Sequence, residues 1–593
     1  MVKMLSLEDA MDKLGIVTDS RNIQISNTTA VAGVVSIATA ITLYKMYSKP
    51  KKPSPAGCKT IKDLPNPPTR FLLGNLYQVG LKEILSTLEN YAWKYGTAYN
   101  YFFGPWPIVI LSSPAAVDQF FKERPHNIRR SFNTEKVFED SNIAGLFSME
   151  GEQWRHSRNW MAPQLTHAKV NKASRVITNH LLALKSDMEQ RSKRNEGIHQ
   201  KWFPRTDQQT GSSDAWPETV RYDPDDLVHE ITAYRHYAFS VIVDFAFAHD
   251  NSNLFSPTLF EDMKVIFDVV RRRAAIPFSY WKYGIRTASD RKFDQVIADL
   301  KGSIKHIIDN YNPEDFKNDS DKMSTMLESL WFAAQEDDAI TERSGISTAR
   351  KAAKRVSIDD VIGNLITAII AGYVNNSPNF GASSDTTSNT LHIITYFLSC
   401  HPEVQRKLHE ETDRILGRPE KRANYTAEEL YALFEVDIVK QFPYTWAVIQ
   451  ESNRLMPVAA LIDGKLTKDL VLDNVFLPKG TTVFAMSRVA AFRACPTPEP
   501  FKFKPERWIE STPEQRRLHE KLSWGFGGGP RVCPGRHLAG MELVGALAVV
   551  ISLFDVQPME EPFSAPNVIE GMDLTSLLLN ANLRYLPRYQ VQQ

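Results

Sequence analysis

Hydrophobic and polar positions divide this chain into a mostly helical body and a smaller strand-rich part. From Gln153 onward apolar residues recur at helical spacing, most clearly between Leu538 and Val550. Residues 99–111 instead form two short apolar runs around a turn, which is typical of paired strands. The last third mixes short strands with loops. The pattern therefore predicts a mainly α domain with a smaller β-rich lobe.

One apolar run lies near the N-terminus, at residues 30–47, and it is uncharged as far as Tyr44. Started at residue 27, this run would form a helix of about 32 Å, and a bilayer core is roughly 30 Å thick. Four lysines follow between positions 45 and 52, which by the positive-inside rule places the larger part in the cytoplasm. The preceding polar segment, 1–29, contains four acidic residues, unlike a signal peptide or a mitochondrial presequence. We therefore predict a single-pass membrane anchor at 30–47.

Residues 48–68 contain six prolines and predict a semi-rigid linker. After it, residues 69–593 predict one large domain, because the motifs below are spread through it. Polar stretches at 192–226 and 311–322 read as surface loops within this domain.

The composition excludes several classes of protein. A formal net charge of +1 over 593 residues gives no reason to expect nucleic acid as a partner. The four cysteines are too few for a disulfide framework, and none has the paired spacing of a zinc site.

The candidate chemistry lies in the glycine-rich segment 526–535, which ends at Cys533 and runs into an apolar helix. Backbone N–H groups and the helix dipole at a helix N-terminus favour thiolate over thiol. The glycines remove side chains where the loop passes a flat ligand, and Arg531 is a fixed cation beside the sulfur. These features predict a thiolate ligand for haem iron, with Arg531 facing a haem propionate. The alternative is a buried structural cysteine beside a tight turn.

This segment resembles the haem-binding loop of the cytochromes P-450, Phe-x-x-Gly-x-Arg-x-Cys-x-Gly. Its fixed positions are met by Phe526, Gly529, Arg531, Cys533 and Gly535. The resemblance covers roughly residues 65–588. It implies the cytochrome P450 fold, with haem b (iron protoporphyrin IX) between a long oxygen-side helix and the helix that follows the cysteine loop.

Two segments that carry paired acidic and basic residues follow one another in the order found in that family. Glu451 and Arg454 are three residues apart on a predicted helix that stops at Pro457, and Pro505-Glu-Arg-Trp508 follows. The resemblance implies that Glu451, Arg454 and Arg507 form a buried ionic network that supports the haem-binding loop. Taken alone, such a pair is usually a solvated contact worth under about 1 kcal/mol.

Trp154 and Arg158 lie four residues apart on another predicted helix. The resemblance implies that both donate hydrogen bonds to a haem propionate; a half-buried tryptophan beside a solvated arginine is the alternative. Lys465 follows Pro457 near a position where the family often has a propionate-binding arginine. We assign it to a propionate by position alone, since lysine lacks the bidentate fork of arginine.

Asp385 and Thr386 match the family's acid–alcohol pair on the oxygen-side helix, which implies that they deliver protons to the oxygen site. A helix N-cap is the alternative use of these residue types. Residues 365–372 already resemble the first half of that motif, so residues 373–383 look like an insertion or a mis-spliced gene model. A real insertion would bulge or break the helix beside the oxygen site.

The resemblance implies a haem-thiolate monooxygenase that inserts one atom of dioxygen into a lipophilic organic substrate. Electrons would come from NADPH through a separate NADPH–cytochrome P450 reductase, with cytochrome b5 as a further candidate donor. The anchor would hold the catalytic domain on the cytoplasmic side of the endoplasmic reticulum membrane. Two alternatives stay open: a haem-thiolate isomerase or dehydratase that needs no reductase, and a non-catalytic haem-binding gas sensor.

Overall fold

The structure is a computed structural model of the 593-residue chain. It describes residues 55, 57–70, 73–75, 84–104, 106–131, 134–141, 143–172, 174–202, 230–247, 259–275, 279–284, 286–310, 326–327, 358–372, 386–422, 424–434, 437–558, 569–572, 576–579 and 583–588. The predicted anchor at 30–47 and the polar stretch at 311–322 lie outside these residues. Residues 53–593 form one compact unit.

Helices dominate this unit, as the sequence predicts. Their bounds are α3 Ile84–Tyr95, α4 Pro114–Glu123, α5 Thr134–Asp140, α6 Gly151–Gln164, α7 His167–Lys172, α8 Ser174–Trp202, α9 Glu230–Phe247, α11 Leu259–Ala275, α12 Ala288–Asp309, α16 Ile358–Gly372, α17 Thr386–Cys400, α18 Pro402–Leu416, α19 Pro419–Arg422, α20 Ala427–Phe434, α21 Ile438–Gln441, α22 Pro443–Leu455, α23 Ser487–Arg493, α24 Pro513–Leu522 and α25 Arg536–Leu553.

The strands are short and form four small sheets. Their bounds are β1 Lys59–Thr60, β2 Ala98–Phe103, β3 Trp106–Leu111, β4 Ile128–Arg129, β5 Leu461–Leu466, β6 Leu470–Leu472, β7 Val475–Leu477, β8 Thr482–Met486, β9 Phe554–Pro558, β10 Ile569–Met572, β11 Ser576–Leu579 and β12 Leu583–Pro587. The largest sheet has the order β2-β3-β8-β5-β4, and β1-β7-β6 form a second sheet. The predicted strand pair at 99–111 is confirmed as β2 and β3, which are antiparallel.

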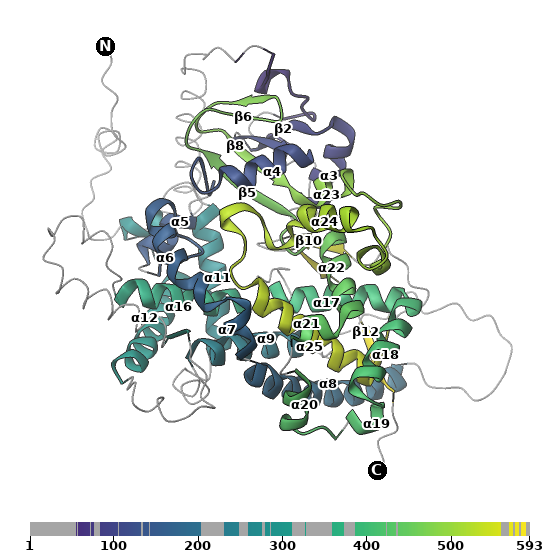
Figure 1. The fold of residues 1–593 in the computed structure, drawn as a ribbon. Coiled ribbons are helices and arrows are strands. Elements are labelled where there is room, and N and C mark those ends of the chain that lie inside the picture. Colours follow the sequence, from purple (N-terminus) through teal and green to yellow (C-terminus); the bar gives the residue numbers. More distant parts are fainter. Residues whose placement is uncertain are drawn as a thin grey trace, which may run out of the picture. The chain divides into compact units, whose positions relative to one another are not determined.

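Helices α3 and α4 cover opposite faces of the five-stranded sheet, because side chains alternate along each strand. On β3, Ile108 and Ile110 belong to the cluster around α3, whereas Val109 and Leu111 pack with α4. Figure 1 shows this strand-rich part at the top, around the labels α3, α4 and β8.

The main core is helical and surrounds α25. This helix is apolar all round and lies against α8, α17, α18 and α22, and almost all of its side chains are buried. Within the described part of the chain it is the one helix long and apolar enough to cross a membrane, but 83% of it is buried inside the protein. We therefore assign α25 to the core. The loop that leads into it runs between the strand-rich part and the helices (Figure 1).

Two predicted segments differ from the structure. Residues 59–64, expected in the proline-rich linker, belong to the folded unit: β1 pairs in parallel with β7, and Leu64 is buried. The predicted surface loop at 192–226 begins too early, because α8 continues to Trp202. Ser192 is buried there, and its hydroxyl donates to the carbonyl of Tyr585 at 2.5 Å.

Candidate haem-thiolate site

The loop before α25 folds around Cys533. The Cys533 N–H donates to the carbonyl of Phe526 at 2.9 Å and closes the loop. Two short 3-10 turns, 524–526 and 529–531, lie within or next to it. Gly535 is the N-cap of α25, which begins at Arg536. The helix thus starts three residues after the cysteine.

Burial and local hydrogen bonding act in opposite directions on this sulfur. Burial raises the pKa of the Cys533 thiol, against the opposing effects of the Gly535 N–H and the charges of Arg158 and Arg536. The Gly535 N–H acts in the predicted direction, but burial has the larger effect on the thiol. Because a coordinated metal ion deprotonates a thiol outright, iron would reverse this balance.

The loop glycines are required by α4. Gly529 has φ +60°, and a Cβ there would lie 2.2 Å from the carbonyl oxygen of Phe121. A Cβ at Gly528 would lie 3.0 Å from the Phe121 ring. These contacts explain the glycines through packing, which differs from our expectation that they make room for a flat ligand.

Arg531 is held by protein groups on the segment that leads into α6. Its guanidinium donates to Glu150 Oε2 and to the Met149 carbonyl, both at 2.6 Å. It also lies 4.4 Å from the centroid of the Trp154 ring. Burial lowers the pKa of Arg531 to about 10, so it remains a cation at neutral pH.

Two more arginines belong to this group, and their unused donors test whether a haem could fit. Arg130 follows β4, with its Nε 3.8 Å from Glu150 Oε1. Arg124 is buried, and burial, aided by the charge of Arg130, lowers its pKa to about 10. The Nε atoms of Arg124, Arg130 and Arg531 are all buried without a hydrogen-bond partner. Since buried donors are normally satisfied, these residues fit a group that brings further carboxylates, as haem does.

Trp154 and Arg158 both come from α6, as predicted. Trp154 is buried under the Arg531 guanidinium. Arg158 is half-buried, and its pKa is lowered by burial and raised by Cys533. The structure thus brings both residues to the cysteine loop. Trp154 lies beside Arg531, and Arg158 lies near Cys533.

Glu451, Arg454 and Arg507 meet in one buried network. Glu451 on α22 accepts hydrogen bonds from Arg454 Nε, Arg454 Nη2 and Arg507 Nε, each at 2.8 Å. The Trp508 indole and the Lys504 backbone N–H also donate to it, both at 3.0 Å. Burial opposes its ionisation, but these donors and the two arginines hold the pKa of Glu451 below its usual value.

The oxygen-side elements are two helices in the described part of the chain, α16 ending at Gly372 and α17 beginning at Thr386. Asp385 lies outside the described residues. Thr386 is exposed on the first turn of α17, which differs from the enclosed position expected for a proton-delivering hydroxyl. Its neighbour Thr387 is buried and donates to Glu542 Oε2 of α25 at 3.1 Å.

Lys465 is exposed on β5, in register with Arg129 of β4. Gly464 beside it faces inward, toward Phe120 and Ile128, so alternation along the strand turns Lys465 outward. Arg130, not Lys465, is the cation that the fold brings next to Glu150 and Arg531.

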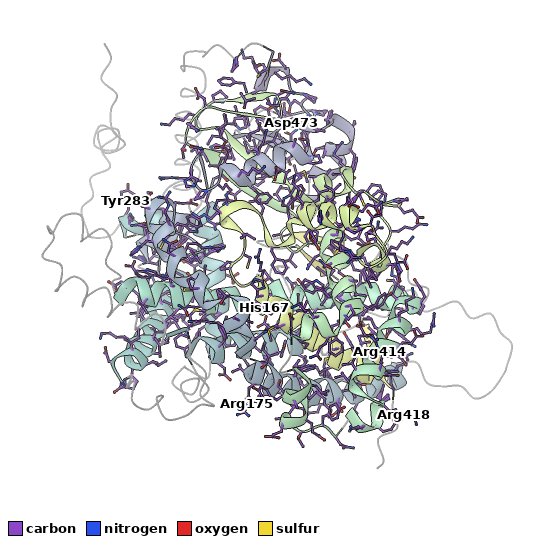
Figure 2. The ribbon with its side chains drawn as sticks, in the orientation of Figure 1. His167, Arg175, Tyr283, Arg414, Arg418 and Asp473 are labelled. Carbon is purple, nitrogen blue, oxygen red and sulfur yellow. The ribbon has the colours of Figure 1, made fainter. Side chains whose placement is uncertain are left out.

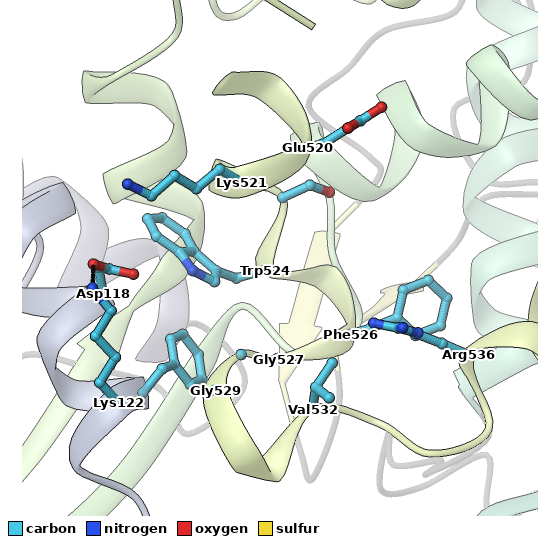
Figure 3. A pocket seen from close by; sticks show the side chains of 13 residues that line it. Asp118, Lys122, Glu520, Lys521, Trp524, Phe526, Gly527, Gly529, Val532 and Arg536 are labelled. Atoms are coloured by element: carbon cyan, nitrogen blue, oxygen red, sulfur yellow. Dashed lines mark ion pairs between the residues drawn. The ribbon is translucent and has the colours of Figure 1, made fainter. Parts of the chain in front are cut away.

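A separate pocket of about 310 Å³ opens beside the cysteine loop (Figure 3). It is lined by Asp118 and Lys122 of α4, by Lys521 and Trp524, and by loop residues including Arg536. Figure 2 shows His167 of α7 near the start of α25, and its ring lies 5.7 Å from that of His537. Phe526, Gly529 and Val532 of the cysteine loop also line this pocket, whereas Cys533 and Trp154 do not, so it lies on another side of the same loop.

Sequence reasoning missed Glu150, Arg124, Arg130 and the Thr387–Glu542 contact. Glu150 is separated from Arg531 by 381 residues and Thr387 from Glu542 by 155, so no local spacing links them. A weak signal was the adjacent pair Arg129-Arg130 at the end of β4, which is also typical of a solvent-exposed strand end.

Comparisons with known proteins agree with this geometry. The family model described as Cytochrome P450 matches residues 64–575. The chain is similar to "25-hydroxyvitamin D-1 alpha hydroxylase, mitochondrial" of Rattus norvegicus, with 26% identity over 88% of this chain and 94% of that protein. Cytochrome P450 3A9 of Rattus norvegicus is 24% identical over 79% of this chain and 80% of its own length.

A solved structure has the same fold. The crystal structure of a cytochrome P450 (CYP102L1) aligns with a TM-score of 0.64, covering 90% of this chain and 100% of that chain, at 17% identity. The predicted mainly α fold with a smaller β-rich lobe is thereby confirmed. The family match over most of the chain, together with a thiol-bearing loop that opens the central helix, shows that this chain belongs to the cytochrome P450 family and is a haem-dependent oxidoreductase of the monooxygenase type.

Proposed function

We propose that the chain is a membrane-anchored monooxygenase that oxidises a lipophilic substrate with electrons from NADPH, supplied through a separate reductase. The observation that carries this proposal is the meeting of Cys533, Trp154 and three incompletely bonded arginines at one loop. Haem bound there would supply the activation of dioxygen, and a thiolate ligand favours cleavage of the O–O bond.

The residues of this chain would hold the cofactor in separate roles. Cys533 would hold the haem iron through its thiolate, and the arginines would neutralise the propionates. The Glu451 network would hold residues 504–508 against α22 and in this way support the cysteine loop. Asp385 and Thr386 remain our candidates for moving protons to the oxygen site, and Lys465 is the weakest of the proposed propionate contacts because it is exposed.

The proposed lipophilic substrate is supported by the character of the oxygen-side helix. Buried residues of α16 are mostly branched aliphatic, among them Leu365, Ile366 and Ile369. The rat relative is named for hydroxylating 25-hydroxyvitamin D, which gives one example of a substrate class to screen first. Its name also contains "mitochondrial", so the proposed endoplasmic reticulum location needs a direct test by fractionation.

The electron donor is proposed from the chemistry of the fold. Three basic and two acidic side chains line the pocket beside the cysteine loop, and Lys122 is paired with Asp118, so Lys521 and Arg536 are the cations that we propose for an incoming partner. An acidic surface of NADPH–cytochrome P450 reductase or of cytochrome b5 would complement them.

The reduced, carbon-monoxide-bound absorption spectrum tests the thiolate ligand. We expect the strongly red-shifted band of a thiolate-bound haem in the full chain, and its loss in Cys533→Ser. A retained band in that variant would direct the assignment to Cys495 or Cys400. Product formation that depends on NADPH and reductase then separates a monooxygenase from a reductase-independent isomerase and from a gas sensor.

A further inference from the structure

Glu150 is a buried carboxylate at the centre of the arginine group. Its side chain is 1% exposed, and Arg531 lies 2.6 Å from it as an ion pair. The Arg130 backbone N–H also donates to Glu150 Oε1, at 3.3 Å. Glu150 therefore bonds to the cysteine loop and to the end of β4 at the same time.

Its place in the sequence connects a third element. Glu150 is the N-cap residue of α6, but its side chain makes no capping bond there. It reaches across to the arginines instead, one turn before Trp154, whose ring lies under Arg531. The side chain thus forms a buried long-range ion pair instead of a local hydrogen bond at the helix N-terminus.

The charges in this group are not balanced by Glu150 alone. Three guanidiniums, Arg124, Arg130 and Arg531, lie within electrostatic reach of one another, and the described carboxylates acting on them are Glu150 and Asp463. Asp463 is also occupied by Ser131, whose backbone N–H donates to it at 2.8 Å. Among these five groups the positive charges outnumber the negative ones, and the Nε atoms of the three arginines have no hydrogen-bond partner.

We propose that Glu150 is a positioning residue that acts as an internal counter-ion: it fixes Arg531 and Arg130 at the haem edge and sets the electric field there. This inference rests on the proposed haem-binding function. Glu150 already accepts a hydrogen bond from Arg531. The donors that would remain for the propionates are therefore the Nε atoms of Arg124, Arg130 and Arg531.

The proposal predicts an effect on the reduction potential with a definite sign. Reduction of haem iron adds one negative charge, so nearby positive charge favours the reduced form. Neutralising Glu150 adds one net positive charge and should raise the potential. Neutralising Arg130 removes one and should lower it. A role limited to holding the fold would not produce opposite shifts.

The experiment compares Glu150→Gln with Glu152→Gln, in the purified full chain loaded with haem. Glu152 lies two residues away on α6, is 82% exposed and pairs only with Arg155 among described residues, so it is a matched control. Reduction potentials are measured by spectrophotometric titration, and haem loss by transfer to apomyoglobin. We expect Glu150→Gln to keep the red-shifted carbon monoxide band, to have a more positive potential, and to lose haem several-fold faster than the control.

Potentials and haem-loss rates equal to those of the control would overturn the proposal. If Glu150→Gln does not fold, Arg130→Gln decides: a more negative potential supports the proposal, and an unchanged or more positive one overturns it. The failure of the proposed function is recognised separately, because the unmodified chain would then lack the red-shifted band.

Discussion

Glu451 shows how a single buried charge can be essential without being catalytic. It satisfies two arginines, an indole N–H and a backbone N–H at the same carboxylate. Removing one member of a buried ion pair leaves its partners unpaired in a medium of low dielectric. The carboxylate is therefore required by its neighbours more than by any reaction step.

We predict that Glu451→Gln lowers the free energy of unfolding by about 3–5 kcal/mol, or prevents haem loading altogether. Glu499→Gln is the control, because Glu499 forms a solvent-exposed pair with Lys502, and such pairs contribute little to stability. Urea denaturation followed by circular dichroism measures both. Equal losses in the two variants would contradict the buried-network argument.

His519 contributes a pH dependence. Burial first, then the charges of Arg507 and Arg454, lower the pKa of His519 to about 4. Between pH 6.5 and about 4 the unfolded chain binds a proton that the folded chain does not, so stability falls as the pH is lowered through this range. The contribution is complete above pH 6.5 and amounts to about 3 kcal/mol at most.

We expect His519→Phe to flatten this part of the stability profile. Phenylalanine keeps the ring contact with Trp508, whose ring centroid lies 5.2 Å away, and has no proton to bind. Denaturation midpoints at pH 7, 6, 5 and 4 provide the measurement. A variant with the same slope as the unmodified chain would assign the acid sensitivity to other groups.

At the scale of elements, local pattern and tertiary contact contribute differently. The residue spacing predicts α6, α22 and α25, because each has a clear apolar periodicity or a helix stop. It does not predict that α8 continues through a polar stretch to Trp202, since Ser192 is anchored there by β12. The spacing also does not reveal why the loop has glycines, because they make room for Phe121 of α4, which is far away in the sequence.

Two glycines around the cysteine loop should respond oppositely to alanine. We predict that Gly529→Ala abolishes haem binding or soluble expression, because it requires φ +60° and would force a Cβ to 2.2 Å from a carbonyl oxygen. Gly540→Ala on α25 should be neutral or gain up to about 1 kcal/mol, since its Cβ would meet Trp446 at 3.6 Å and Val439 at 3.9 Å, both ordinary van der Waals contacts. Haem content and melting temperature distinguish them, and similar behaviour of the two variants would contradict this packing.

On the scale of the whole molecule, the oxygen side is where this chain departs from its family. Helices α16 and α17 end and begin on either side of residues 373–385. Thr387 connects α17 to Glu542 of the cysteine helix, so the first turn of α17 is fixed to the core at this point. Thr386, one of the two proposed proton-delivering residues, therefore lies on an anchored turn.

We predict that deleting residues 373–383 joins Gly372 to Ser384 and makes catalysis more efficient. The reason is that one continuous helix would bring Asp385 and Thr386 to the position that proton delivery requires. The measurement is the fraction of consumed NADPH recovered as product, against hydrogen peroxide released. An unchanged fraction, in a variant with an intact carbon monoxide band, would show that the segment does not limit proton delivery.

The sequence by itself determined the family, the helix after Cys533, the strand pair at 98–111 and the order of the acid–base motifs. All of these depend on neighbours a few residues apart, where periodicity and spacing act directly. Tertiary structure alone decided that Glu150 pairs with Arg531, that Thr387 donates to Glu542, and that the Cys533 sulfur is buried. Long-range pairing and desolvation depend on which surfaces the fold brings together, and no local pattern encodes them.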